Sequence, residues 1–206
     1  MTLLYPTYFA PIIQYAALLQ SSKYTFEIED NFQKQSYRTR CYIYGSNGKQ
    51  LLSVPVKHHP KGLKKKTKEV KIDNETTPWK KIHLKSIQAA YRSSPFFEFY
   101  ENDLEALFQK KHDYLLDLNL DIHDFIMAAL QENCNYSKTK TYEITSSAND
   151  LRILANAKIK PQTTFSKYIQ MFDGKHGFIE NLSILDLLFM EGPQASEYLK
   201  KLELSI

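Results

Sequence analysis

The sequence predicts an α/β protein of the α+β kind, in which an N-terminal mixed or antiparallel sheet with a hairpin is followed by helices packed against it. Segments typical of strands are concentrated before residue 77, and long stretches with helical spacing of apolar side chains follow. The chain lacks the regular alternation of strands and helices that is typical of a doubly wound parallel sheet. Because domains usually contain about 100–200 residues, the 206 residues are expected to form one domain over residues 1–206.

The strand-forming part begins with a short strand at residues 3–5, and a turn directed by proline then leads into a helix at residues 11–19. Residues 24–30 alternate apolar and polar side chains, as a half-buried strand does. Residues 40–56 contain two β-rich runs around an Asn-Gly pair, which supplies the positive φ angles of a hairpin turn. Residues 69–73 are a further candidate strand, so sheet structure is expected over much of this part.

The rest of the chain is predicted to be mainly helical. Helical spacing is present at residues 78–92, 96–111, 114–133, 184–190 and from residue 193 onward. Thr77 is placed to cap the first of these helices, and Ser183 begins a capping pattern before the fourth. Residues 139–145 are an expected edge strand between the third and fourth helices.

The composition argues against several classes of protein. The two cysteines, Cys41 and Cys134, are too few and too far apart for a disulfide framework or a metal site, so neither a metal nor a cofactor is expected. No run of about 18 apolar residues is present, so no membrane span is expected. The apolar N-terminus is interrupted by Pro6 and Pro11 and lacks the features of a signal peptide. A reducing, cytoplasmic location is therefore expected.

Positive charge is concentrated in one segment, which we call the Lys-rich segment (residues 57–71). It contains seven Lys and one Glu, a local charge of +6, so the rest of the chain carries −2 of the net +4. The segment is short and has no interleaved aromatic residues, which argues against nucleic acid as a partner. Two interpretations stay open: a solvated loop, or a source of positive field that attracts phosphorylated ligands.

His83 lies at the centre of the inward face of the helix predicted at residues 78–92, because a rotation of about 100° per residue places it in the same arc as Trp79. A neutral imidazole in that position needs hydrogen-bond partners. It therefore either fixes the packing or lines a pocket as a general acid or base. Asn119 falls within the apolar arc of the helix at residues 114–133, where it either fixes the helix register or orients His83 or a ligand.

Basic side chains also gather at Lys34, Arg38 and Arg40. If residues 37–43 are extended, Arg38 and Arg40 share one face of the sheet, and two guanidinium groups on one face can hold a phosphate or carboxylate. The alternative is that both arginines form surface ion pairs with the preceding acidic residues, which are Glu27, Glu29 and Asp30. The residue types alone do not favour one interpretation over the other.

Several stretches taken together resemble the WbqC-like family, in particular its Bacteroidetes-type members. They are YPTYFAPIIQY, the D-x3-K-x3-R-x-R spacing of Asp30, Lys34, Arg38 and Arg40, NGKQLLSVPV, the W-x3-H-x7-Y spacing of Trp79, His83 and Tyr91 with the following SPFF, and KHGFIENLSILDLLFMEGP near the end. The resemblance covers most of the chain. Two departures are visible, because the usual R-N-R reads Arg38-Thr39-Arg40 here and the stretch at residues 138–170 is shortened.

The resemblance implies a bacterial group-transfer enzyme of surface-polysaccharide (O-antigen) biosynthesis, which transfers an amino-acyl or acyl group to an amino sugar or a sugar nucleotide. Its implied catalytic residues are His83, which would move a proton, and Tyr91, which would hydrogen bond to the ligand. The implied residues that bind a small anionic or sugar-nucleotide ligand are Lys34, Arg38 and Arg40. Asn119, which the helical spacing singles out, is expected to join them and to orient His83 or the ligand. Two rivals are a non-catalytic binding or accessory protein and a weak nucleic-acid binder acting through the Lys-rich segment.

Overall fold

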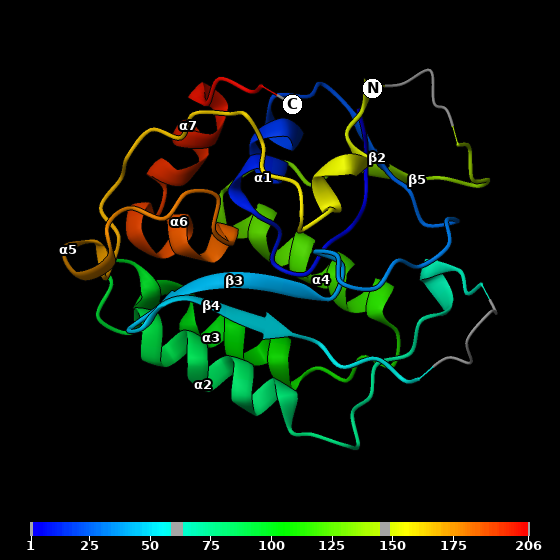
Figure 1. Ribbon diagram of the computed structural model, residues 1–206, viewed down its shortest axis with the longest axis horizontal. Helices are drawn as coiled ribbons and strands as arrows, with labels where there is room; N and C mark the ends of the chain where they lie inside the picture. Colours follow the sequence, from blue (N-terminus) through cyan, green and yellow to red (C-terminus); the bar gives the residue numbers. More distant parts are fainter. Residues whose placement is uncertain (1, 59–63, 145–148, 206) are drawn as a thin grey trace.

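A computed structural model describes residues 2–58, 64–144 and 149–205. It shows a mixed α/β protein, which confirms the predicted fold class. An antiparallel hairpin of β3 (Arg40–Gly45) and β4 (Gly48–Ser53) crosses the middle of the molecule (Figure 1). Helices lie on both sides of it: α2 (Trp79–Tyr91) and α3 (Phe97–Gln109) on one side, and α1 (Ile12–Leu19), α6 (Ile184–Glu191) and α7 (Gln194–Lys201) on the other.

A second sheet has four strands and is parallel throughout, unlike the mixed or antiparallel sheet that the sequence favours. Its strands are β1 (Thr2–Leu4), β2 (Tyr24–Phe26), β5 (Tyr136–Lys138) and β6 (Asn149–Asp150), in the order β5-β2-β1-β6. Each strand has only two or three residues, which is too short for a pattern of alternation to be recognised. Parallel pairing requires a long crossover, and α1 supplies it between β1 and β2.

The predicted helices are confirmed, with ends shifted by a few residues. The long third helix is α4 (Leu115–Ala129), and one further turn, α5 (Asp173–His176), precedes α6. Ser183 caps α6 as predicted, because its Oγ accepts a hydrogen bond from the backbone N–H of Leu185. Gly192 ends that helix with a φ of 53°, a left-handed conformation that glycine tolerates best.

Three expected strands differ from the structure. Residues 37–39 form a turn in which the Thr39 N–H donates to the Ser36 carbonyl, so they are not extended and β3 begins only at Arg40. Residues 69–73 do not form a strand, because Glu69 ends the 3-10 helix η1 (Thr67–Glu69) and only Lys71 and Ile72 form isolated bridges. The expected edge strand at 139–145 is also wrong, because β5 precedes it; residue 145 lies outside the described residues.

The core joins both sheets and the helices. One cluster of buried apolar side chains extends from Leu4 in β1 to Leu202 at the end of α7, and it includes Ile43 of the hairpin and Ile87 of α2. Over residues 2–58, 64–144 and 149–205, no helix combines the length and the apolar character needed to cross a membrane.

Candidate functional site

Charged and polar side chains are buried together at the carboxyl ends of the parallel strands. Tyr5 directly follows β1, Glu27 directly follows β2, and Arg152 begins the 3-10 helix η2 (Arg152–Ala155) just after β6. On one side of β1 the sheet continues with β2 and then β5, whereas β6 pairs with the other side of β1. Ligands of open parallel sheets bind outside the carboxyl ends where the strand order changes direction in this way. We call this region the carboxyl edge.

Arg38 is held at the carboxyl edge by an ion pair and an aromatic ring. Its side chain is 1% exposed, and its Nη2 donates to Asp30 Oδ2 over 2.8 Å. The ring of Tyr5 covers the guanidinium group, with Cζ of Arg38 3.7 Å from the ring centroid. The other oxygen of Asp30 accepts a hydrogen bond from Thr67 Oγ1 at 2.6 Å. Burial raises the pKa of Tyr5 well above its ordinary value although Arg38 opposes the change, so Tyr5 is a neutral phenol at pH 7.

Several polar atoms near Arg38 are buried without a hydrogen-bond partner among the described residues. They are Nε and Nη1 of Arg38, Nε of Arg40 and Oδ1 of Asn119. Most buried polar groups in proteins are hydrogen bonded, so such atoms call for an explanation, such as a ligand or ordered water. The Nδ2 of Asn119 donates to the carbonyl oxygens of Arg38 (2.9 Å) and Pro6 (3.2 Å). The structure therefore places Asn119 beside Arg38, which precedes Arg40 by two positions in the sequence.

A second buried arginine, Arg152, extends the carboxyl edge. Its Nη2 lies 2.5 Å from Asp150 Oδ2, and its Nη1 lies 3.7 Å from Glu27 Oε2. The carboxylate of Glu27 is 1% exposed and also accepts a hydrogen bond from Thr139 Oγ1 at 2.8 Å. The alternative of surface ion pairs is therefore wrong about where the pairs lie. Asp30 does form an ion pair with Arg38, but both side chains are buried, and Glu27 faces Arg152.

His83 is buried among aromatic rings. It is 4% exposed, its Nδ1 lies 2.7 Å from Tyr8 Oη, and its ring centroid is 5.2 Å from that of Trp79. Burial lowers the pKa of His83 to about 4, although a hydrogen bond with the Ser53 backbone opposes this, so the ring is neutral at pH 7. Ser53 pairs with Arg40 across the hairpin, which places His83 at the same end of the hairpin as Arg40.

Tyr91 belongs to a different buried network. Its Oη accepts a hydrogen bond from the Tyr44 backbone N–H (2.9 Å) and donates to Asp186 Oδ1 (2.7 Å). The fully buried carboxylate of Asp186 also accepts from Tyr168 Oη (2.6 Å). Tyr44 is four residues from Arg40 along β3, a separation of about 13 Å in an extended strand. The structure therefore does not bring Tyr91 together with the arginines.

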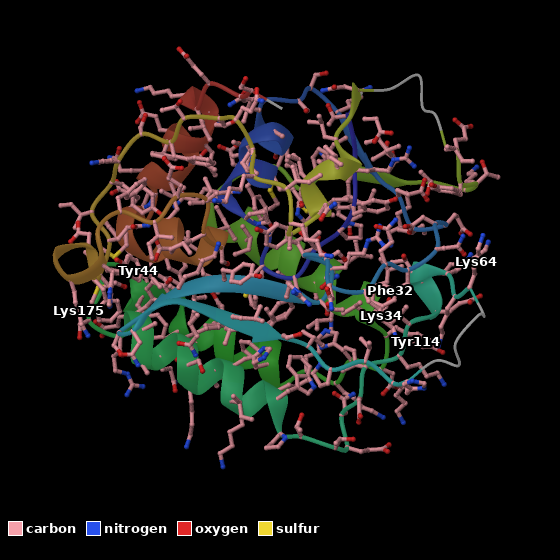
Figure 2. All side chains as sticks on the ribbon, in the orientation of Figure 1. Phe32, Lys34, Tyr44, Lys64, Tyr114 and Lys175 are labelled. Carbon is pink, nitrogen blue, oxygen red and sulfur yellow. The ribbon has the colours of Figure 1, made fainter. Side chains whose placement is uncertain are left out.

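Lys34 and the Lys-rich segment lie on the outer side of the carboxyl edge. Figure 2 shows the exposed Lys34 next to Phe32, at the opposite end of the hairpin from Tyr44. Within the segment, Lys66 and Lys68 both bind Glu29, at 2.8 and 2.5 Å. Its residues 59–63 lie outside the described residues. Part of its charge is therefore neutralised by an ion-pair network on the protein.

Sequence reasoning missed the loop that connects these parts. This loop, residues 5–8, contributes the Tyr5 ring over Arg38, the Pro6 carbonyl that Asn119 binds, and the Tyr8 hydroxyl that His83 binds. The stretch was noticed as part of the family resemblance, but nothing in its residues indicated these contacts. Arg152 gave no signal because its neighbours lack a recognisable pattern.

The structure argues against a thiol nucleophile and gives no metal centre within its described part. Burial raises the pKa of the Cys41 thiol well above its ordinary value, so this residue stays protonated and is a poor nucleophile. No group of three or more His, Cys, Asp or Glu side chains in the described part of the chain is arranged to hold a metal ion. The chemistry that the site can offer therefore comes from buried arginines, carboxylates, an amide and phenols.

Fold and site together define a mixed α/β protein with a buried charged site at the carboxyl edge of a short parallel sheet. The model of the WbqC-like protein family matches residues 6–176. The chain therefore belongs to the WbqC-like protein family, and the match includes Arg38, His83, Asn119 and Arg152. No curated protein and no solved structure is significantly similar to the chain.

Proposed function

We propose that the protein is a group-transfer enzyme that binds a small anionic substrate, of the sugar-nucleotide kind, at the carboxyl edge. The observation that carries the proposal is the pair of buried Arg38 nitrogens, Nε and Nη1, that have no partner among the described residues. A guanidinium group with free N–H donors binds phosphate and carboxylate oxygens strongly. Such an anion would supply the acceptors that Arg38 and Arg40 lack.

In this proposal the two arginines have different tasks. Arg40 is half-buried, so a ligand arriving from solvent meets it first, whereas Arg38 lies deeper, under the Tyr5 ring. Lys34 is exposed on the same side and adds to the positive field outside the site. Asn119 holds the Arg38 backbone through its Nδ2, which leaves its Oδ1 to accept a hydrogen bond from a ligand hydroxyl or amine.

The proposed reaction is transfer of an amino-acyl or acyl group to the amine of an amino sugar, in the surface-polysaccharide setting that the family resemblance implies. A C–N bond forms between the amine and the acyl carbon, and the bond from that carbon to the donor's leaving group breaks. The leaving group departs with the electron pair of that bond and takes up the proton that the amine loses. His83 is buried against Tyr8, and Tyr91 is buried against Asp186. In this proposal, therefore, each of them holds its neighbouring residues in place and does not contact the substrate. Their predicted catalytic roles stay predictions.

Substitution of Arg40 tests the proposal, because a half-buried residue can be changed with little risk to the fold. Calorimetric titration of a panel of nucleoside diphosphate sugars should show binding to the unmodified protein and at least tenfold weaker binding to Arg40→Gln. The matched control is Arg92→Gln, which removes an exposed ion pair with Glu101. Equal binding to all three proteins, or to none, would rule out the proposed ligand site.

The burial of His83 favours a second candidate, a non-catalytic ligand-binding or accessory protein of the same family. A ring that is 4% exposed and hydrogen bonded to Tyr8 is explained by its packing and need not take part in turnover. The two candidates differ in one measurement: an enzyme forms the acylated amino sugar from donor and acceptor, and an accessory protein binds the ligand without forming product. A nucleic-acid role has less support, because Glu29 neutralises part of the Lys-rich segment.

A further inference from the structure

A cavity of about 330 Å³ lies beyond the carboxyl end of β6. Its walls are formed by η2 and the segment after it, the start of α1 and the turn before β3. Two of its apolar side chains, Ile153 and Ile159, are 48% and 45% exposed, so apolar surface is accessible from solvent at the cavity. The Tyr37 N–H donates to the Ala155 carbonyl (2.8 Å) and joins the turn to η2, so the cavity is built into the fold.

Two asparagines that line this cavity, Asn156 and Asn181, offer hydrogen-bond donors to it. Asn181 Oδ1 accepts from the Ile13 N–H and Asn156 Oδ1 accepts from the Lys158 N–H, both at 3.0 Å. Because the oxygen of each amide is engaged, its NH2 group is the part available to a ligand. Lys160 also lines the cavity, and no lining residue is acidic.

A second ammonium group lies close to the cavity. Lys49 Nζ is 4.3 Å from the centroid of the Tyr42 ring, and Tyr42 packs edge-on against Tyr37, which lines the cavity. Burial, and to a smaller extent the positive charge of Lys160, lower the pKa of Lys49, so the two ammonium groups repel each other. Within the described ranges, neither lysine forms an ion pair.

We propose that this cavity binds a small molecule with an apolar chain and a carboxylate group. The chain would lie against the isoleucines, and the carboxylate would accept hydrogen bonds from Lys160 and the Asn181 amide. The cavity is at the lower end of the range for ligand sites, about 300–1,000 Å³. A cationic ligand would meet two positive charges, and a purely apolar one would leave the donors without water or partner. The inference goes beyond the proposed function because it requires neither turnover nor Arg38.

Sodium octanoate is a suitable probe, with octylammonium as the ligand of opposite charge. Titration of the full chain should give saturable binding of one octanoate, and binding to Lys160→Glu should be at least tenfold weaker. Ile153→Trp, a change at a half-exposed position, should fill the cavity and abolish binding while the urea unfolding midpoint stays unchanged. Lys81→Glu, on the exposed face of α2, is the matched control and should bind as the unmodified protein does.

Several outcomes would overturn this inference. Absence of saturable octanoate binding would do so, as would octylammonium binding of similar strength, which would indicate a non-specific apolar surface. Unchanged binding in Lys160→Glu would place the ligand elsewhere. Loss of octanoate binding in Arg40→Gln with retention in Lys160→Glu would assign the carboxylate to the carboxyl edge, and would support the proposed function while overturning the separate cavity site.

Discussion

The ionisation of His83 tests whether its ring faces a wet cavity or the dry interior. Burial lowers the pKa of His83 from 6.5 to about 4. The unfolded chain therefore takes up a proton on this ring as the pH falls below 6.5, and the folded protein resists protonation until about pH 4. Stability from this source is complete above pH 6.5 and is lost progressively as the pH falls towards 4.

The size of the effect follows from the two pKa values. The pKa of His83 falls from 6.5 to about 4, and one pKa unit is about 1.4 kcal/mol. Below pH 4 the unfolding free energy has therefore lost about 3 kcal/mol relative to its value well above pH 6.5. Between pH 7 and pH 5 the same linkage gives a loss of about 2 kcal/mol. His123, with a pKa lowered to about 3 by burial, adds a similar loss over that interval. The protein is therefore expected to be strongly acid-sensitive.

Urea unfolding at pH 7 and pH 5 measures this loss. His83→Gln should lose about 2 kcal/mol less than the unmodified protein between the two pH values, because glutamine does not titrate. The control is His58→Gln, at an exposed position, which should lose as much as the unmodified protein. Carboxyl groups titrate equally in all three and cancel. An equal loss in His83→Gln, or an NMR titration of His83 near pH 6.5, would show a hydrated ring and would favour the general acid or base.

Three further outcomes are expected. Asp30→Asn should lower the unfolding free energy by about 3–5 kcal/mol, because Arg38 is left as a buried charge without its counterion. Tyr91→Phe should cost about 1–3 kcal/mol, because it removes a donor from the buried Asp186 and an acceptor from a backbone N–H. Both changes are measured by urea unfolding at pH 7. Replacement of Lys64–Lys66 by serine should leave retention on immobilised nucleic acid at low salt unchanged.

The two stability predictions each have a matched control on the surface. Glu101→Gln breaks the exposed pair with Arg92 and should cost less than about 1 kcal/mol. Tyr114→Phe changes a 37% exposed tyrosine and should have little effect. If Asp30→Asn costs no more unfolding free energy than Glu101→Gln, Arg38 is not a buried charge that depends on Asp30. If the triple serine variant loses retention on nucleic acid, the nucleic-acid alternative gains support.

The sequence predicted the long elements well and the short ones poorly, for a physical reason. A helix such as α4 has enough residues for its apolar spacing to be recognised. The hairpin was predicted from its Asn-Gly pair, although the turn residues are Ser46 and Asn47, and only Gly48, the first residue of β4, has a positive φ, of 96°. The parallel strands have two or three residues, and their partners are distant in the sequence. Parallel pairing of so few residues depends on tertiary packing, which single-sequence patterns do not contain.

The site was predictable only in part for the same reason. Arg38 and Asn119 were visible as charged or polar residues in unexpected places, and they do lie together. Their real partners, however, are separated from them in sequence: Asn119 contacts Pro6, 113 positions away, and Tyr8 contacts His83, 75 positions away. Geometry on a helical wheel shows which way a side chain points, but it cannot show which loop it meets.

The loop between β1 and α1, residues 5–11, ties these parts together, and its construction argues for a role beyond packing. Loops normally run over the surface, but every residue of this one is buried. Phe9 has a φ of 39°, a left-handed conformation that costs a bulky residue about 1–3 kcal/mol. Its carbonyl is held by Ser183 Oγ at 2.9 Å, so the surrounding structure enforces that conformation. Such strain persists where the fold must place particular groups, and this loop places Tyr5 over Arg38 while Tyr8 binds His83.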